Sequence, residues 1–565
     1  MHLVCTPIKK SYSSSKVNFL IRDFNPKYQD SFSIKIFNYE ECYNQIKSNF
    51  LISKLIRKKY FPEIVSILNN FHNKNFSTDY WNVLIGLWTQ RNIDMILFKF
   101  NLLNSTNLLN KINSVNNITN SNIQLNATNT YYSIISNQNL IQTNMIYIDI
   151  LNFLKKDITI IDVQCDNYKP YYEKIKFSKF SKNFFVNKIS PLITQTYLGK
   201  KNEIFLNINL KSVPRFWSIP EEIFVKNNPN VRESLSDRFY KKSISLKFEE
   251  YFKYSFFKLI PNCYLEGFEK NYMYSKSLNL PKNPKFIFSA NYLPYHELFR
   301  FYLADQKEKK TKIIAYQHGG NYGSAKFIAN PSSEEEFCDK FLTWGWTEQK
   351  KNVPMFMYVR KKIFYNKKNK NILFFVDGIS GEYFPFDSYA ILRKHNNKVI
   401  ELLNLFPKSL KSQIIIKTHP RKDSLNKINF KSWKDFNKKN KNIFNLNNDN
   451  TPNLVRNLAR YAIHTYEGTA FLEDLHLNNP FYLILKNDIR FIRNTSKKYF
   501  KLLLDNNIAF ENSVVAAEFI IKNHNKIEDW WSSKKIQFIL KKVRFALCRY
   551  EPCPVKKLTS FLSKI

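Results

Sequence analysis

The chain has 565 residues, of which 44% are hydrophobic and 24% charged, and its formal net charge is +41. This length predicts two or three domains, and the apolar content excludes a disordered chain. The charge favours anionic partners such as nucleic acid, anionic lipid or phosphorylated small molecules, while a codon bias toward lysine would explain the same charge without any partner.

The first half of the chain mixes strand and helix patterns. A strand is expected within 16–24, and the apolar stretches 41–71 and 78–103 indicate helices. Residues 101–143 are rich in Asn, Ser and Thr, which predicts a polar connector or surface loop. From residue 284 the pattern becomes strand–helix–strand, as in parallel βαβ units. The strands are expected at 285–290, 312–316 and 338–346, with a helix over 294–310.

A hydrophilic linker at 366–371 precedes a second strand–helix series. Its strands are expected near 372–378, 413–420, 442–447, 461–468 and 480–485, with helices between them. This alternation predicts a doubly wound α/β domain. The fold class we expect is therefore α/β with two Rossmann-like lobes and a helical, irregular N-terminal elaboration. The lobes would comprise 1–365, with helical and Asn-rich insertions on the acceptor side, and 366–535, which binds the nucleotide sugar; a helical tail would follow over 536–565.

The first candidate motif is Gln317-His318-Gly319-Gly320, directly after an expected strand. The chain has only ten glycines, so two in succession are informative. Glycine lets backbone amides approach a ligand closely, and a histidine at a strand end can bind a phosphate or sugar hydroxyl or move a proton. The alternative is a tight turn with a half-buried histidine.

The second motif is Lys417-Thr418-His419-Pro420-Arg421. Proline suits the first turn of a helix, which would place His419 where unpaired N–H groups attract anions. Lys417 and Arg421 add positive charge, and arginine binds phosphate in a bidentate manner. The alternative is a capped turn with surface cations.

Further candidates follow two other strands and begin one helix. Gly468 and Thr469 open a helix and predict a second anion site, beside which Glu467 would accept hydrogen bonds from a ribose. Asp377 follows the first strand of the second lobe and would orient the donor or serve as a catalytic carboxylate, unless it forms only an Asx turn. Glu297, at the start of a helix, would face the cleft that we expect between the two lobes. We find no P-loop and no metal-binding pattern, so we expect no metal.

These segments resemble a family of transferases encoded in O-antigen and other surface-polysaccharide gene clusters of bacteria. The resemblance covers about 210–535 and rests on 213–223, 286–327, 332–346, 414–421 and 464–485. It extends more distantly to capsule Kdo transferases, and all of these resemble B-type glycosyltransferases (GT-B). In these relatives, which use CMP- or CDP-activated donors, the histidine of the HP motif contacts the nucleotide phosphate; the resemblance assigns that role to His419. Many members have a small polar residue where this chain has Glu467.

The function we expect is that of a metal-independent glycosyltransferase that uses a nucleotide-activated, CMP-linked sugar to build surface polysaccharide, lipopolysaccharide or capsule. The donor is a substrate, and no cofactor is expected. The residues assigned to donor and sugar binding are Gln317, Gly319, Gly320, Lys417, His419, Arg421, Glu467, Gly468 and Thr469, and those assigned to catalysis are His318, Asp377 and Glu297. Inversion and retention both stay open.

The expected partners and location follow from charge and composition. The acceptor would be lipid-linked or a glycan, and the basic surface would rest on anionic lipid at the inner face of the cytoplasmic membrane. The first ten residues lack the apolar region of a signal peptide, no run of about 20 apolar residues occurs, and the seven scattered cysteines fit reduced thiols in the cytoplasm.

Two other functions fit the sequence less well. A CDP-polyol phosphotransferase would use the same fold. A basic nucleic-acid-binding protein would need a basic stripe interleaved with exposed aromatic residues. Here the lysines are spread throughout and the aromatic residues lie in apolar periodic runs, so we expect no nucleic-acid partner. A non-catalytic homologue of the transferases is a further alternative.

Overall fold

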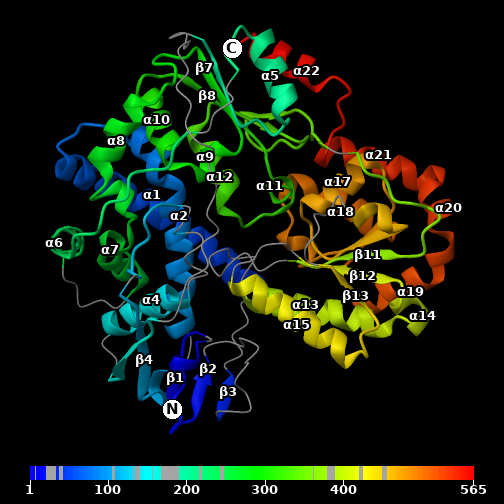
Figure 1. Cartoon of the computed structure of the whole chain (residues 1–565), viewed down its shortest axis with the longest axis horizontal. Coiled ribbons are helices and arrows are strands. Elements are labelled where there is room, and N and C mark those ends of the chain that lie inside the picture. Colours follow the sequence, from blue (N-terminus) through cyan, green and yellow to red (C-terminus); the bar gives the residue numbers. More distant parts are fainter. Residues whose placement is uncertain are drawn as a thin grey trace.

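The structure is a computed structural model. It describes residues 1–6, 8–20, 33–36, 42–104, 109–121, 123–130, 133, 140–154, 157–166, 190–214, 219–241, 247–360, 362–377, 389–418, 424–447 and 455–565. Within these ranges the strands form three sheets, and every paired strand runs parallel to its neighbours. The predicted α/β fold class is confirmed (Figure 1).

The N-terminal sheet has the strand order β3-β2-β1-β4-β5. Its strands are β1 (His2–Val4), β2 (Asn18–Leu20), β3 (Ile34–Ile36), β4 (Ser114–Thr119) and β5 (Thr159–Gln164). Strand β4 pairs with both β1 and β5, so part of the Asn-rich segment 101–143 is the inner strand of a sheet and not a surface loop. A side chain from another element supports this strand: Asn144 in α4 accepts a hydrogen bond from the Ile118 amide and donates one to the Asn116 carbonyl.

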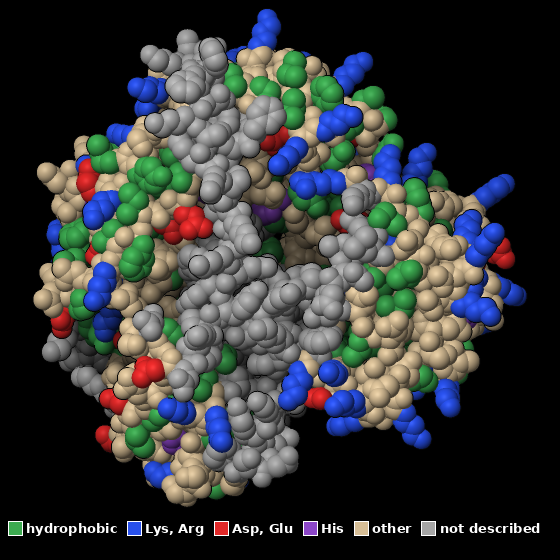
Figure 2. Space-filling view, in the orientation of Figure 1, with side chains coloured by type: hydrophobic (Ala, Val, Ile, Leu, Met, Phe, Trp, Pro, Cys, Tyr) green, Lys and Arg blue, Asp and Glu red, His purple; other side chains and the backbone are tan. Residues whose placement is uncertain are grey.

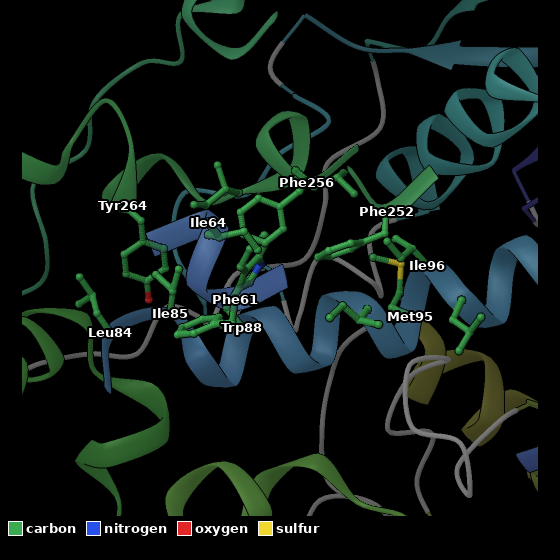
Figure 3. Close-up of a cluster of buried hydrophobic side chains, with 14 of the residues drawn as sticks. Phe61, Ile64, Leu84, Ile85, Trp88, Met95, Ile96, Phe252, Phe256 and Tyr264 are labelled. Atoms are coloured by element: carbon green, nitrogen blue, oxygen red, sulfur yellow. The ribbon is translucent and has the colours of Figure 1, made fainter. Parts of the chain in front are cut away.

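A helical layer follows this sheet (Figure 1). Helices α1 and α2 cross each other, and α7 packs on α2. Figure 3 shows their contact, in which Phe61 and Ile64 from α1 meet Trp88 from α2 and Phe252 and Phe256 from α7. The helices of this layer are α1 (Tyr43–His72), α2 (Thr78–Asn104), α4 (Leu140–Phe153), α6 (Pro229–Phe239), α7 (Phe248–Leu259) and α8 (Phe268–Ser277).

The second sheet follows the sequence in the order β6 to β10. Its strands are β6 (Leu192–Ile193), β7 (Phe286–Ser289), β8 (Lys312–Tyr316), β9 (Lys340–Thr343) and β10 (Asn352–Pro354). The associated helices are α5 (Lys200–Asn209), α9 (Tyr292–Tyr295), α10 (Glu297–Glu308), α11 (Asn321–Ser324) and α12 (Ala329–Phe337). Strands β7, β8 and β9 confirm the three strands predicted after residue 284.

The third sheet has the order β13-β12-β11-β14-β15-β16, the doubly wound pattern that reverses direction after β11. Its strands are β11 (Ile372–Phe375), β12 (Ile414–Lys417), β13 (Asn445–Asn447), β14 (Tyr461–His464), β15 (Phe481–Ile484) and β16 (Ala509–Phe510). Its helices are α13 (Tyr389–Leu405), α14 (Lys408–Lys411), α15 (Ser424–Lys439), α17 (Thr469–Leu477), α18 (Asn494–Leu504) and α19 (Ser513–Asn523). Ligands bind such sheets beyond the carboxyl ends of the strands, at the point of reversal.

The chain ends in helices that return to the second sheet. Helices α20 (Ile527–Ser532) and α21 (Lys534–Leu547) pack beside the third sheet, and α22 (Pro554–Leu562) lies against α5 (Figure 1). One apolar core includes residues of both sheets and of these helices. Among the described helices, none combines the length and the apolar character needed to cross a bilayer.

Candidate functional site

The QHGG loop begins where β8 ends, and Gln317 holds its shape. The Gln317 side chain is fully buried. Its Oε1 accepts hydrogen bonds from the Trp344 amide and from Trp346 Nε1, each at 2.8 Å, and its Nε2 donates to the Gly319 carbonyl at 2.8 Å. These bonds tie the loop to the end of β9. The structure thus gives Gln317 a positioning task, and its role in ligand binding stays a prediction.

Gly320 brings the QHGG loop into contact with the predicted anion site at Gly468 and Thr469. Its amide donates to Thr469 Oγ1 at 3.0 Å, and the nearby Ser324 hydroxyl donates to the Glu467 carbonyl at 3.0 Å. A Cβ on Gly320 would lie 2.7 Å from the backbone of Gly468 and of Thr469, closer than real contacts allow. Only glycine permits this approach. The carboxyl edge of the second sheet therefore meets the carboxyl edge of the third at this point.

His318 belongs to a hydrogen-bonded group with Tyr322 and Glu334. The Tyr322 hydroxyl lies 2.6 Å from His318 Nε2 and donates to Glu334 Oε1 at 2.6 Å. Because that hydroxyl proton goes to the carboxylate, the hydroxyl oxygen accepts from Nε2–H, which leaves the lone pair of the imidazole on Nδ1. Glu334 is buried, and its Oε2 has no hydrogen-bond partner among the residues that the structure describes. The group can hold His318 in one orientation and one tautomer.

Charged groups gather at the carboxyl edge of the third sheet. Asp377 follows β11 and forms an ion pair with Lys486, 2.7 Å from Oδ2 to Nζ. Glu467 follows β14, and its Oε1 accepts from the Lys486 amide at 3.0 Å. Burial raises the pKa of Glu467 to about 7, against the opposing effect of Lys398 and Lys486. A carboxyl group with this pKa can exchange a proton near neutral pH.

A buried network of hydrogen bonds and ion pairs lies next to this edge and holds its residues in place. Asp474 in α17 accepts from Arg456 Nε at 2.9 Å, from His464 Nε2 at 2.8 Å and from the Tyr365 hydroxyl at 2.7 Å. Burial opposes ionisation of Asp474, but Arg456, His464 and Asn479 together outweigh it, so the pKa of this carboxyl is lowered. Arg456 also pairs with Glu473 at 2.9 Å. The network fixes α17, and with it Gly468 and Thr469, relative to β14.

The remaining predicted residues lie apart from this contact or outside the described residues. Lys417 is buried at the end of β12, and its Nζ donates to the Thr418 carbonyl at 2.8 Å. His419 and Arg421 fall outside the described residues. Glu297 is 2% exposed. Its carboxylate accepts from the Thr130 amide at 3.0 Å and from the Tyr264 hydroxyl. This enclosure makes Glu297 a structural carboxylate, and we do not propose it as catalytic.

Sequence reasoning missed Tyr322, Glu334 and Lys486. Glu334 lies in a run of three glutamates, which reads as a solvated charged segment, yet Glu334 and Glu335 are both buried. Tyr322 lies in the short helix α11 (Asn321–Ser324), and His318 lies in the loop before it, so no helical spacing in the sequence indicated that the two side chains meet.

Figure 2 shows a hollow between the two halves of the molecule, with a histidine side chain at its rim. Within the described ranges, no three His, Cys, Asp or Glu side chains lie grouped as metal ligands. The site is thus defined by two loops in contact, a polar group on one side and charged groups on the other.

The chain belongs to the LIC12162 family of transferases, whose model matches residues 1–562. This confirms the family resemblance seen in the sequence and shows that the protein is a transferase. The comparison with curated proteins gave no significant match.

Solved structures with partial likeness include three sugar transferases or synthases. The α,α-trehalose 6-phosphate synthase from Burkholderia multivorans is 9% identical, over 67% of this chain and 98% of that one, with a TM-score of 0.34. Sucrose-phosphate synthase from Thermosynechococcus elongatus is 9% identical, over 53% and 76%, with a TM-score of 0.32. WaaG, a glycosyltransferase involved in lipopolysaccharide biosynthesis, is 12% identical, over 54% and 82%, with a TM-score of 0.29. These scores are too low to support an argument about function.

Proposed function

We propose that this transferase is a glycosyltransferase of the two-lobed GT-B type that moves a sugar from a nucleotide-activated donor to a glycan or lipid-linked acceptor. The observation that carries the proposal is the contact between Gly320 and the Gly468–Thr469 backbone. It brings the carboxyl edges of two parallel sheets together, so that one edge can hold the donor while the other faces the sugar and the acceptor. The family supplies the reaction class, group transfer.

The donor phosphates would bind where α17 begins. The amides of the first helical turn have no partners within a helix, and the helix dipole adds partial positive charge there. When the nucleotide departs, negative charge develops on its terminal phosphate, and these amides would stabilise that charge. Thr469, whose hydroxyl accepts from Gly320, keeps this end of α17 against the QHGG loop.

His318 would accept the proton of the acceptor hydroxyl. The hydroxyl of Tyr322 and the carboxylate of Glu334 would hold the ring in the orientation in which it acts as the base. Of the two carboxylates suggested from the sequence, Asp377 lies at the carboxyl edge of the third sheet and pairs with Lys486. We propose that Asp377 orients the donor and that Glu467, with a pKa of about 7, binds it in a pH-dependent manner.

The donor nucleotide and the product are further parts of the proposal. The family resemblance favours a CMP-linked sugar and a role in surface-polysaccharide or O-antigen synthesis, without a metal or another cofactor. The test is a thermal-shift screen with CMP, CDP, UDP and GDP, because a ligand that binds the native state raises the melting temperature by mass action. We expect CMP to give the largest shift. No shift with any of the four would contradict the proposal.

A matched pair of variants separates donor binding from chemistry. The His318→Ala variant should keep the nucleotide-induced shift and lose sugar transfer, because His318 acts on the acceptor. The Glu467→Gln variant should weaken the nucleotide-induced shift. If His318→Ala instead loses the nucleotide-induced shift, the donor binds to the QHGG loop on the side of the second sheet and not at α17. A larger shift with CDP-glycerol than with CMP-sugars would instead indicate polyol-phosphate transfer.

A further inference from the structure

Helix α21 presents an unusual surface to solvent. Its buried side consists of apolar residues that pack into the core, Ile536, Ile539, Leu540, Val543, Ala546 and Leu547. Its other side, which we call the basic-aromatic face, consists of six exposed residues: Lys534, Lys535, Phe538, Lys541, Lys542 and Phe545. Phe538 is 60% exposed and Phe545 is 61% exposed. A helix that is only the solvated edge of a domain would carry polar residues at these positions.

The six residues of the basic-aromatic face lie together on one side of the helix. With about 100° between successive residues, all six fall within an arc of roughly 120°. Phe538 and Phe545 occupy the middle of that arc, and the lysines flank them on both sides. Lys542 Nζ lies 4.2 Å from the centre of the Phe538 ring, and the Arg549 guanidinium lies 3.9 Å from the centre of the Phe545 ring. The apolar centre is thus bordered by cations.

The charge of the surrounding chain points to an anionic partner. Residues 534–565 contain nine Lys and Arg residues and one acidic residue, Glu551. No acidic side chain therefore lies on α21 to neutralise the face. Figure 1 shows α21 at the margin of the molecule, and Figure 2 shows Lys and Arg side chains projecting from the same margin. An extended anionic surface would find the face accessible.

We propose that the basic-aromatic face of α21 docks the protein on an anionic phospholipid bilayer. Phenylalanine side chains enter the boundary between headgroups and acyl chains, while lysines at their flanks extend to the phosphates. The two rings lie about 10 Å apart along the helix axis. Both rings project from one face of the helix, as insertion into a flat boundary requires, and each ring already carries a cation on a face where a base would stack, so the face fits a bilayer better than a nucleic-acid strand. The inference does not depend on which group the enzyme transfers.

The experiment is vesicle co-sedimentation of the full-length chain. Vesicles of phosphatidylcholine alone are compared with vesicles containing about a third phosphatidylglycerol, at low and at moderate salt. We expect binding to the anionic vesicles, weakening as salt rises, and little binding to the neutral ones. The F538S/F545S variant should bind the anionic vesicles at least about tenfold more weakly. The K541Q/K542Q variant should lose about as much and depend less on salt.

Matched controls keep the result interpretable. Phe364 is also exposed, at 58%, and lies outside α21, and Lys438 and Lys439 are exposed at the end of α15. The F364S and K438Q/K439Q variants should bind like the wild type, and all variants should keep the wild-type melting temperature because the side chains are exposed. Failure of the wild type to bind, or equal binding by F538S/F545S, would overturn the proposal. Binding to single-stranded DNA in place of vesicles, lost in F538S/F545S, would also overturn it.

Discussion

The two sides of the candidate site are built in different ways. On the side of the second sheet, the QHGG loop is held by hydrogen bonds between buried neutral groups, and a Cβ on Gly320 would collide with the opposite backbone. On the side of the third sheet, Asp377, Glu467 and Lys486 carry charge, and the pKa of Glu467 is raised to about 7.

Neutral hydrogen bonds thus fix the shape of the QHGG loop, whereas charged side chains set the properties of the edge of the third sheet. Buried neutral hydrogen bonds lose much of their value when a partner is removed, since the other partner is left unsatisfied. Charged groups at an edge respond instead to pH and to ligands. Substitutions in the loop should therefore change stability at every pH, whereas substitutions at the edge of the third sheet should change how stability depends on pH.

The largest effect is expected for Gln317→Leu. The substitution keeps the size of the side chain but leaves the Trp344 amide, Trp346 Nε1 and the Gly319 carbonyl without their partner. Unfolding by urea should show a loss of about 3 kcal/mol. The exposed Gln164, whose side chain donates to the exposed Asp166, serves as the control, and Gln164→Leu should stay within about 0.5 kcal/mol of the wild type. Equal small effects of the two substitutions would show that the loop does not depend on Gln317.

Neighbouring glycines give the next test. A Cβ on Gly320 would meet backbone atoms at 2.7 Å, whereas one on Gly319 would meet only the Tyr322 ring at 3.4 Å. Gly320→Ala should cost about 1–3 kcal/mol of unfolding free energy and most of the transferase activity, and Gly319→Ala should cost about 0.5 kcal/mol or less. Melting curves and a transfer assay on the pair check this. If Gly320→Ala is fully active and stable, the two edges are not in functional contact.

Tyr322→Phe removes the hydroxyl between His318 and Glu334. We expect kcat to fall by about ten- to a hundredfold with KM unchanged, and the pH profile of kcat to shift, because His318 loses the group that orients it. Tyr316→Phe is the matched control, since its buried hydroxyl donates to the Phe356 carbonyl at 2.5 Å. That control should lose a similar amount of stability without the change in the pH profile. If the pH profile of kcat is unchanged in Tyr322→Phe, the hydrogen-bonded group of His318, Tyr322 and Glu334 has only a structural role.

The last effect concerns Glu467 and is confined to pH values above about 4.5. Its pKa in the folded protein is about 7, above its ordinary value of 4.5, so the folded state binds a proton that the unfolded chain releases. Glu467 therefore lowers stability progressively as pH rises through this window. Glu467→Gln should match the wild type near pH 4.5 and be more stable above pH 7, by roughly 3 kcal/mol. Parallel stability curves for the two proteins would contradict the raised pKa.

The sequence predicted the strands and loops of the site better than the partners of its side chains. Short continuous apolar runs located β8, β9, β11, β12 and β14, because parallel strands that are buried on both faces are apolar throughout. The glycines of QHGG and EGT were also found, but not that Gly320 and Gly468 touch, since nothing local encodes a contact across 148 residues. Nothing in the sequence indicated that the Gln317 side chain bonds to the end of β9, and its role in ligand binding stays a prediction.

Polar residues in structural positions account for most of what was missed. Strand β4 lies in an Asn-rich stretch, where asparagine amides satisfy backbone groups instead of marking a loop. Glu334 looks solvated in sequence and is buried beside Tyr322. In each case the side chain is paired by a distant segment, and pairing of that kind cannot be inferred from composition or periodicity.

A crystal structure of the protein with a bound nucleotide would show directly whether the donor lies at the contact between the two sheets. We expect the nucleotide phosphates at the first turn of α17, between the Gly320 loop and the Asp377–Glu467 edge. A nucleotide bound away from the Gly320–Thr469 contact, with both loops unoccupied, would contradict it.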